Sequence, residues 1–298
     1  MPSATPPLIF DRRLLRQRLA RALAKGAEGF LLARAIEEFD ERLCAIKREF
    51  SAVLDAGTPL PGLARFLAGR LQPRLMIRMA PLAAAAGDDG PALRLVGDEE
   101  CLPFAAERFD LAVSALSQHC LNDLPGALIQ LRRVLKPDGL FLGCLLGGAS
   151  LQELRASLMA AESEICGGAS PRVAPFADVR DMGGLLQRAG FALPVADCET
   201  LTVRYSSMFG LMADLRAMGA ANALTARLRK PMPRRFFLRA AEIYAGRFAD
   251  PDGRVRATFE LIFLSGWAPH ASQQKPLPPG SARMRLAEAL KTKEGEGR

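Results

Sequence analysis

The chain lacks long apolar runs, closely spaced cysteines and more than two histidines. No apolar run approaches the roughly 18 residues that a membrane-spanning helix needs, so we expect no span. The six cysteines form no C-x-x-C pair, a scatter typical of reduced, mostly buried thiols rather than of structural zinc. A two-histidine, one-carboxylate iron site also gains no support, because His119 alone is expected near the cleft and His270 stands at the start of the tail. We therefore predict no metal site.

What is present is the composition of a globular protein with a sizeable core: 298 residues, 49% of them hydrophobic and 24% charged. Basic residues exceed acidic ones by eight, and the stretch Arg216–Arg239 holds seven basic residues and no acidic one. This stretch is either a solvated helical face or a docking surface for an acidic partner, RNA or an anionic membrane. We do not expect nucleic acid as the partner, since only Phe236 and Phe237 interleave aromatic rings with these cations.

Hydrophobic periodicity divides the chain into three parts. Residues 1–50 have the three-and-four spacing of amphipathic helices, and we assign them to an N-terminal helical extension. Residues 51–269 alternate short apolar runs with amphipathic segments, which predicts a parallel sheet with helices on both faces and a helical insertion at about 207–250. Residues 270–298, rich in Pro, Gly, Lys and Glu, are expected to form a loosely ordered tail.

Two local motifs carry more specific expectations. The run from Lys136 to Gly139 predicts a helix end and a chain reversal, in which Gly139 can adopt a positive φ. Ser150 and Glu153 have the spacing of a capping box, in which Ser150 would be the N-cap of the next helix. A strand would lie between these two motifs.

The central segment resembles a known enzyme superfamily. Residues 97–143 match, in register, the D-x-x-x-L-P-F, F-D-L and L-K-P-x-G pattern of class I methyltransferases that use S-adenosylmethionine. The resemblance implies an α/β, Rossmann-like fold of seven strands, with N-terminal helices and a helical insertion before the last strand. It also implies S-adenosylmethionine as the cofactor.

A narrower resemblance covers roughly residues 9–285. The segments IFDRRLLRQR, GGASLQELRASLMAAE and MFGLMADLRAMGAANAL are similar to those of the mitochondrial complex I assembly factor and its bacterial relatives. That family implies modification, by hydroxylation, of an arginine on an iron–sulfur subunit of complex I, which would then be the protein partner. We expect a cytoplasmic location in a bacterium, or the mitochondrial matrix in a eukaryote. The more distantly similar malonyl-carrier-protein methyltransferases leave open an active methyltransferase on a small molecule or carrier protein, and a non-catalytic interaction protein is a third alternative.

The first cofactor loop, VLDAGTPLPGL, departs from the D-x-G-x-G-x-G pattern of the superfamily. Asp55 and Gly57 align with the acid and the first glycine, but Pro59 and Pro61 replace the next two glycines. Proline donates no N–H and adds ring bulk where the backbone must approach the ligand. We therefore expect cofactor binding to be weakened or lost.

Of the remaining cofactor positions, one departs from the superfamily pattern and the others match it. Arg78 stands at the end of the second strand, where the superfamily carries an acid that binds the ribose hydroxyls, and it offers donors but no acceptor. It would suit a phosphate or a carboxylate instead. Asp98 and Glu99, after the third strand, are expected at the adenine, although a turn role for Asp98 is equally open. Ser114 is expected on the pocket floor after the fourth strand.

His119 is the catalytic candidate. It follows the fourth strand at the carboxyl edge of the sheet, where ligands of α/β proteins bind, and it could serve as an acid or base. The alternative is a hydrogen-bonded structural histidine.

Overall fold

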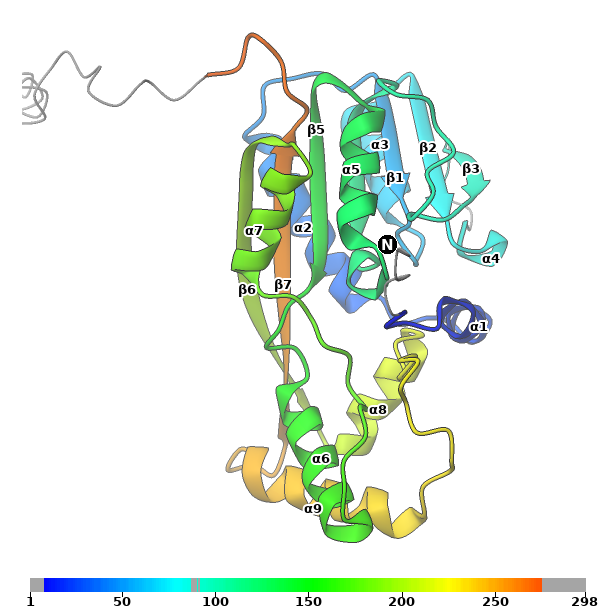
Figure 1. Cartoon of the computed structure of the whole chain (residues 1–298), viewed down its shortest axis with the longest axis vertical. Helices are drawn as coiled ribbons and strands as arrows, with labels where there is room; N and C mark the ends of the chain where they lie inside the picture. The colour runs from blue at the N-terminus through cyan, green and yellow to red at the C-terminus, as the bar shows by residue number, and fades with distance from the viewer. Residues whose placement is uncertain (1–7, 87–89, 91, 275–298) are drawn as a thin grey trace, which may run out of the picture.

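The computed structural model describes residues 8–86, 90 and 92–274, and in these it contains one seven-stranded sheet in the order β3-β2-β1-β4-β5-β7-β6 (Figure 1). The first five strands are parallel, and β7 pairs antiparallel with both β5 and β6. The predicted Rossmann-like arrangement, with N-terminal helices and a helical insertion before the last strand, is confirmed. The strands are β1 (Ala52–Ala56), β2 (Leu75–Ala80), β3 (Leu93–Val96), β4 (Phe109–Ala115), β5 (Leu135–Leu146), β6 (Ala192–Tyr205) and β7 (Val255–Trp267).

Helices cover both faces of this sheet and form a second layer at one end of it. They are α1 (Arg12–Leu23), α2 (Phe30–Cys44), α3 (Leu63–Leu71), α4 (Ala83–Ala86), α5 (Leu124–Val134), α6 (Gln152–Cys166), α7 (Val179–Arg188), α8 (Met208–Ala217) and α9 (Arg234–Phe248), together with the 3₁₀ turn η1 (Gln118–Cys120).

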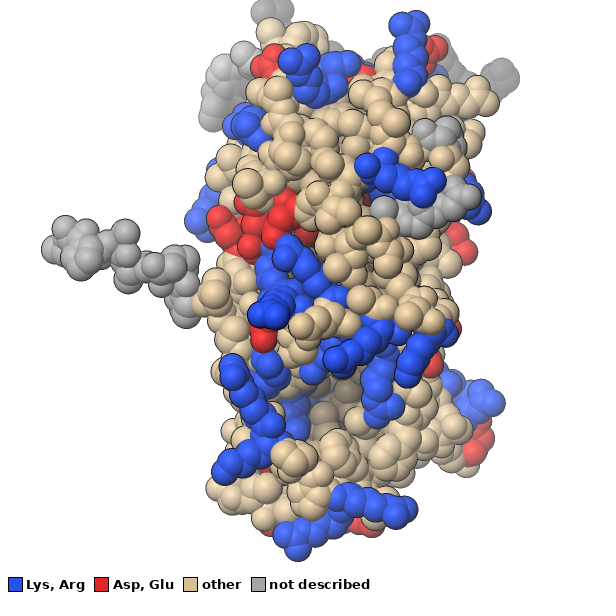
Figure 2. All heavy atoms as spheres, turned by 90° about the vertical axis from the view of Figure 1, so that its right-hand side faces the viewer, with Lys and Arg blue, Asp and Glu red and all other residues tan. Residues whose placement is uncertain are grey.

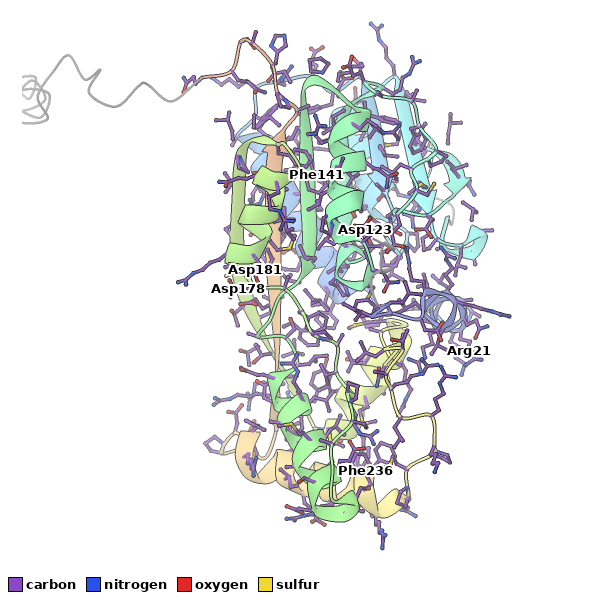
Figure 3. The ribbon with its side chains drawn as sticks, viewed as in Figure 1. Arg21, Asp123, Phe141, Asp178, Asp181 and Phe236 are labelled. Atoms are coloured by element: carbon purple, nitrogen blue, oxygen red, sulfur yellow. The ribbon has the colours of Figure 1, made fainter. Side chains whose placement is uncertain are left out.

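Alternation along the strands places a separate core on each face. Val53 packs into the core that α2 and α3 cover, whereas its neighbour Leu54 packs into the core beneath α5 and α7. In the second core Phe141 of β5 stacks on Phe191 with ring centroids 5.4 Å apart (Figure 3). Both faces are apolar because every central strand lies between two helical layers.

The long strands β6 and β7 run past the rest of the sheet and support α6, α8 and α9 (Figure 1). Tyr244 of α9 donates a 2.7 Å hydrogen bond to the carbonyl of Arg256 on β7, and Phe236 of α9 is fully buried between the layers. The segment Leu201–Tyr205 forms the last five residues of β6. This extension creates the space between the sheet and the helical layer.

Two local expectations are wrong. The residues Lys136–Gly139 belong to β5, which follows α5 directly, and Asp138 rather than Gly139 takes the positive φ, of 62°. Helix α6 begins at Gln152 without a capping box, because Glu153 turns to the buried backbone N–H of Thr258 at 3.1 Å. A tertiary partner therefore replaces the local one.

The cysteines also differ from expectation. Only Cys144 is buried, Cys120 is half-buried, and the other four in the described part of the chain are exposed. Within the described ranges no helix combines the length and hydropathy needed to cross a membrane. Most of the predicted tail, residues 275–298, lies outside the described residues.

Candidate functional site

The loop after β1 turns tightly at the carboxyl edge of the sheet. Gly57 has a φ of +84°, and its N–H donates to the carbonyl of Met79 at 2.8 Å. The hydroxyl of Thr58 accepts from the backbone N–H of Ala115 at 3.2 Å, which ties the loop to β4. Pro59 and Pro61 follow, and neither has an N–H to offer a ligand.

Arg78 turns inward rather than toward a ligand. Its guanidinium is fully buried, lies 3.4 Å from the carboxylate of Asp55, and donates to the carbonyls of Thr58 at 3.3 Å and Ala85 at 2.6 Å. The predicted carboxylate partner is therefore an internal one, and Arg78 ties together the ends of β1, β2 and α4. Among the described residues, Arg78 and Asp55 do not line either of the two cavities considered below.

Three consecutive acids after β3 are held by arginines of α1. The Arg12 guanidinium makes ion pairs with Asp98 at 2.7 Å, Glu99 at 3.0 Å and Glu100 at 2.9 Å, and Arg16 pairs with Asp98 at 2.6 Å. Helix α1 is positioned for this by its N-cap Asp11, which accepts from the N–H of Leu14 at 3.0 Å. The acids that the sequence places at the adenine are thus already partnered within the chain.

The charges of this cluster follow from burial and pairing. Burial raises the pKa of Glu99, which is only 5% exposed, and the nearby Arg12 cation opposes that rise. Burial also works against ionisation of Asp98, but the N–H of Glu100 and the two arginines outweigh it and lower its pKa. The pKa of Arg12 is raised because its carboxylates outweigh its own desolvation.

Glu99 fills the space directly above Gly57. A Cβ on Gly57 would lie 2.2 Å from Glu99 Oε1, so only glycine fits beneath this carboxylate. A cavity of about 110 Å³ remains here, lined by Gly57, Pro59, Pro81 and Glu99 with side chains of α1 and the loop after β4. It is smaller than the roughly 300–1,000 Å³ usual for ligand pockets.

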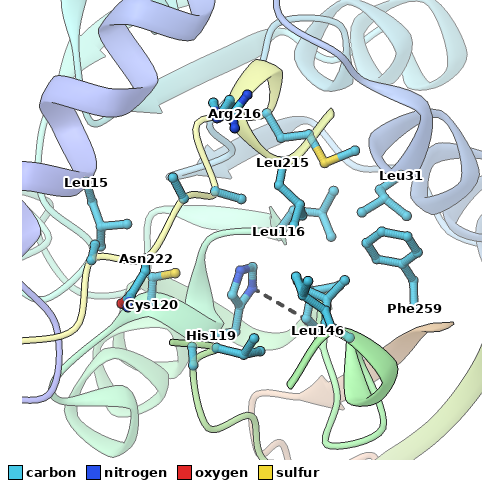
Figure 4. A pocket seen from close by; sticks show the side chains of 18 of the residues that line it. Leu15, Leu31, Leu116, His119, Cys120, Leu146, Leu215, Arg216, Asn222 and Phe259 are labelled. Carbon is cyan, nitrogen blue, oxygen red and sulfur yellow. Dashed lines mark hydrogen bonds between the residues drawn. The ribbon is translucent and has the colours of Figure 1, made fainter. Parts of the chain in front are cut away.

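A second cavity, of about 270 Å³, lies between the sheet and the helical layer (Figure 4). Leucine, phenylalanine, valine and methionine side chains make up most of its wall. Two of these, Leu116 and Leu151, have a left-handed φ of 56°, a strained conformation for leucine that tends to cluster at functional sites. The two cavities share Leu15, Pro59, Leu116, His119, Cys120, Met218 and Ala220.

His119 lies at the boundary between the cavities, and its ring is directed into the larger one (Figure 4). Its Nδ1 accepts a long, 3.5 Å contact from the N–H of Leu146, which leaves the proton of the neutral ring on Nε2. Burial lowers its pKa to about 4, and burial raises the pKa of the neighbouring Cys120 thiol to about 12. At neutral pH the boundary therefore carries a neutral imidazole and a thiol.

The sequence-predicted site residues are only partly brought together. Gly57 and Glu99 line the smaller cavity and His119 lines both, whereas Asp55 and Asp98 line neither. Ser114 is buried beside the site, with its hydroxyl 3.2 Å from that of Ser117, and lines neither cavity. In the described part of the chain, no three His, Cys, Asp or Glu side chains cluster as a metal ion would need.

Sequence reasoning missed Arg12, Arg16 and the wall of the larger cavity. The paired charges of IFDRRLLRQR and GDEE were a visible signal, but more than 80 residues separate them. The cavity wall gave no signal, since its leucines are ordinary core residues of several different elements.

The strand order, with β7 antiparallel between β5 and β6, defines the class I methyltransferase fold, and comparison with known proteins agrees. A methyltransferase domain model matches residues 75–143. The YcgJ protein from Bacillus subtilis superposes with a TM-score of 0.54 at 15% identity, over 82% of this chain and all of that one, which shows the fold alone.

Sequence relatives define the family more narrowly. The mitochondrial arginine-hydroxylase NDUFAF5 of Danio rerio is 38% identical over 95% of this chain and 90% of its own length, and the human protein is 38% identical over 94% and 83%. A malonyl-[acyl-carrier protein] O-methyltransferase of a Methylovorus species is 33% identical over 90% and 93%. The chain belongs to the arginine-hydroxylase NDUFAF5 family, within the class I methyltransferase superfamily.

Proposed function

We propose that this protein is an assembly-type member of its family that binds a protein partner and has lost most of its affinity for S-adenosylmethionine. The superfamily suggests that cofactor, but the residues at its expected position do not fit it in this arrangement. The observation that carries the proposal is the Glu99 carboxylate, packed on Gly57 and held there by Arg12.

The energetic argument starts at the loop. Each hydrogen bond that Pro59 and Pro61 withhold from a ligand is worth about 1 kcal/mol, so the two together weaken binding by roughly 30-fold before ring bulk is counted. A ligand on Gly57 must in addition displace Glu99, whose carboxylate would lose its Arg12 partner or move with it. Arg78, at the position of the ribose acid, presents no acceptor.

Thermal unfolding tests this proposal. A ligand at 100 times its Kd adds about 2.7 kcal/mol to stability, which raises the Tm of a protein of this size by about 4 °C. We expect no shift with 1 mM S-adenosylmethionine or S-adenosylhomocysteine, and a measurable shift for the Pro59→Gly, Pro61→Gly variant, which regains two donors. A shift of several degrees in the unaltered protein would contradict the proposal.

For the partner, the family resemblance implies an iron–sulfur subunit of complex I, and the basic face supports a protein contact. Figure 2 shows Lys and Arg side chains gathered across the side of the molecule that carries α1, α8 and the start of α9. Within the described residues, Arg227 and Arg239 of the stretch 216–239 are used internally, on Asp11 and Glu164. Arg229, Lys230, Arg234 and Arg235 are exposed and make no ion pair there, so they are the cations available to an acidic surface.

An active methyltransferase on a small molecule or carrier protein is the second candidate. It is favoured by the shared wall of the two cavities, which would let a ligand in one contact a ligand in the other. Transfer of label from methyl-labelled S-adenosylmethionine to a medium-chain acid or an acylated carrier protein would support this candidate and contradict the first.

A further inference from the structure

The larger cavity has the chemistry of a binding site for an apolar chain. Its wall combines Leu31 and Leu32 of α2, Leu154 and Leu158 of α6, and Phe259 of β7 with apolar residues of α8 and the connecting loops. Its volume of about 270 Å³ lies just below the roughly 300–1,000 Å³ of pockets for drug-sized ligands. That size suits an unbranched chain of eight to ten carbons.

Most polar groups that border the cavity are already used within the chain. Arg172 makes two hydrogen bonds to Glu162, at 2.7 and 2.8 Å, and its guanidinium lies 4.5 Å from the Phe236 ring centroid. The amide of Asn222 donates to the carbonyl of Pro171 at 2.8 Å. These side chains close the wall rather than receive a ligand.

Two charged side chains at the rim remain to be considered. Glu28 is exposed and accepts from the adjacent N–H of Gly29 at 3.0 Å. Arg216 is exposed and borders the cavity, and among the described residues its guanidinium makes no hydrogen bond or ion pair (Figure 4). Arg216 is therefore the cation that a ligand head group can reach.

Several positively charged side chains lie close to the rim of the cavity. Arg18 of α1 donates to the carbonyl of Asn222, and its pKa is lowered by burial and by the nearby cations Arg227 and Arg21. The Lys and Arg side chains gathered in Figure 2 lie on the side of the molecule that carries α1. A cationic ligand group would be repelled by these arginines at the rim. Deeper in the cavity the wall is apolar, and among the described lining residues no carboxylate other than that of Glu28 at the rim could pair with a cation.

We propose that the larger cavity binds a single medium-length acyl or alkyl chain whose anionic head, a carboxylate or a phosphate, pairs with Arg216 at the rim. The chain lies along the leucines of α2 and α6, and the head stays in solvent. This site goes beyond the proposed function: it does not depend on whether the smaller cavity takes S-adenosylmethionine, so failure of one proposal leaves the other standing.

A chain-length series on the whole protein tests the apolar part. Hexanoate, octanoate, decanoate and dodecanoate are titrated below their micelle concentrations by calorimetry. Each buried methylene strengthens binding by about fourfold, until the cavity is full and the affinity levels off. No binding of any member, or affinity that is independent of length, overturns the proposal.

Head-group analogues and two variants test the charge. Decanoate and decyl phosphate, which distinguish the two sources of the anion, should both bind more tightly than decanol, and decylammonium should bind most weakly. Arg216→Gln should remove the two- to fivefold preference for the anions and keep the chain-length dependence. Arg188→Gln, at an exposed arginine of α7 that does not line the cavity, should change neither. Equal binding of all four heads, or an unaltered preference in Arg216→Gln, overturns the assignment of the head.

A cavity variant locates the chain. Leu158→Phe narrows the cavity and should move the levelling-off to a shorter chain, whereas Leu158→Ala enlarges it and should move it to a longer one. Circular dichroism checks that each variant is folded, and either one alone decides the matter. An unchanged optimum in a folded variant places the chain elsewhere and contradicts the proposal.

Discussion

Replacing Arg12 by Met removes the cation that holds three carboxylates and keeps a side chain of similar length. Glu99 suffers most, because it is only 5% exposed and packs on Gly57. Asp98 retains Arg16, and Glu100 is partly exposed. The loss is therefore dominated by one buried carboxylate without its partner.

Removing one partner of a buried pair costs about 3–5 kcal/mol. Since Arg12 is itself about 15% exposed and water can reach its place, we expect the free energy of unfolding to fall by about 3 kcal/mol at pH 7. Burial raises the pKa of Glu99, and loss of Arg12 raises it further. The folded state then binds a proton more readily than the unfolded state, so the deficit should shrink as the pH falls from 7 to 5.

Urea unfolding followed by circular dichroism measures this deficit at both pH values. Arg13→Met is the matched control, because Arg13 is the exposed neighbour on the same helix and should change stability by less than about 0.5 kcal/mol. In a Glu99→Gln background the Arg12→Met change should cost only about 1 kcal/mol. An equal cost in both backgrounds, or a deficit that grows toward pH 5, would refute the role given to this pair.

Three further outcomes follow from the geometry. His119 should stay neutral down to about pH 4 in an NMR titration, and stability should fall by roughly 3 kcal/mol more between pH 6.5 and 4 than in His119→Phe; a mid-point near 6.5 would contradict this. Glu153→Ala leaves the N–H and hydroxyl of Thr258 buried without an acceptor and should lose about 2–3 kcal/mol in urea unfolding, while Glu153→Gln should lose less; equal losses would argue against the hydrogen bonds. Arg234→Glu with Arg235→Glu should reduce partner capture in a pull-down without changing Tm, and unchanged capture would leave this face as solvated surface.

The fold was predictable because its signals are local. Short apolar runs alternate with amphipathic segments, and each run needed only its own length and flanking residues to be assigned. Expectations went wrong where a distant group competed with a local one. Glu153 has the spacing of a capping residue, but its carboxylate accepts instead from the buried N–H of Thr258, 105 residues away. Asp138 takes the positive φ next to a glycine that could have taken it, a conformation that Asp adopts more readily than most non-glycine residues.

The candidate site was less predictable, because its composition depends on which segments the fold brings together. The substitutions Pro59, Pro61 and Arg78 are visible in the sequence, but the inward direction of Arg78 depends on the carbonyl of Ala85, which only the folded chain places nearby. The position of α1 beside Asp98 and Glu99 depends on ion pairs between residues more than 80 positions apart in the sequence. The larger cavity lies between the sheet and the helical layer, and its lining residues come from several separate elements, so no local sequence pattern predicts it.

Titration calorimetry of the unaltered protein with S-adenosylmethionine tests the central claim most directly. With Glu99 on Gly57 and two prolines in the loop, we predict no saturable heat up to millimolar ligand. Saturable binding with a micromolar Kd would show that Arg12 and Glu99 move aside readily, and would contradict the account.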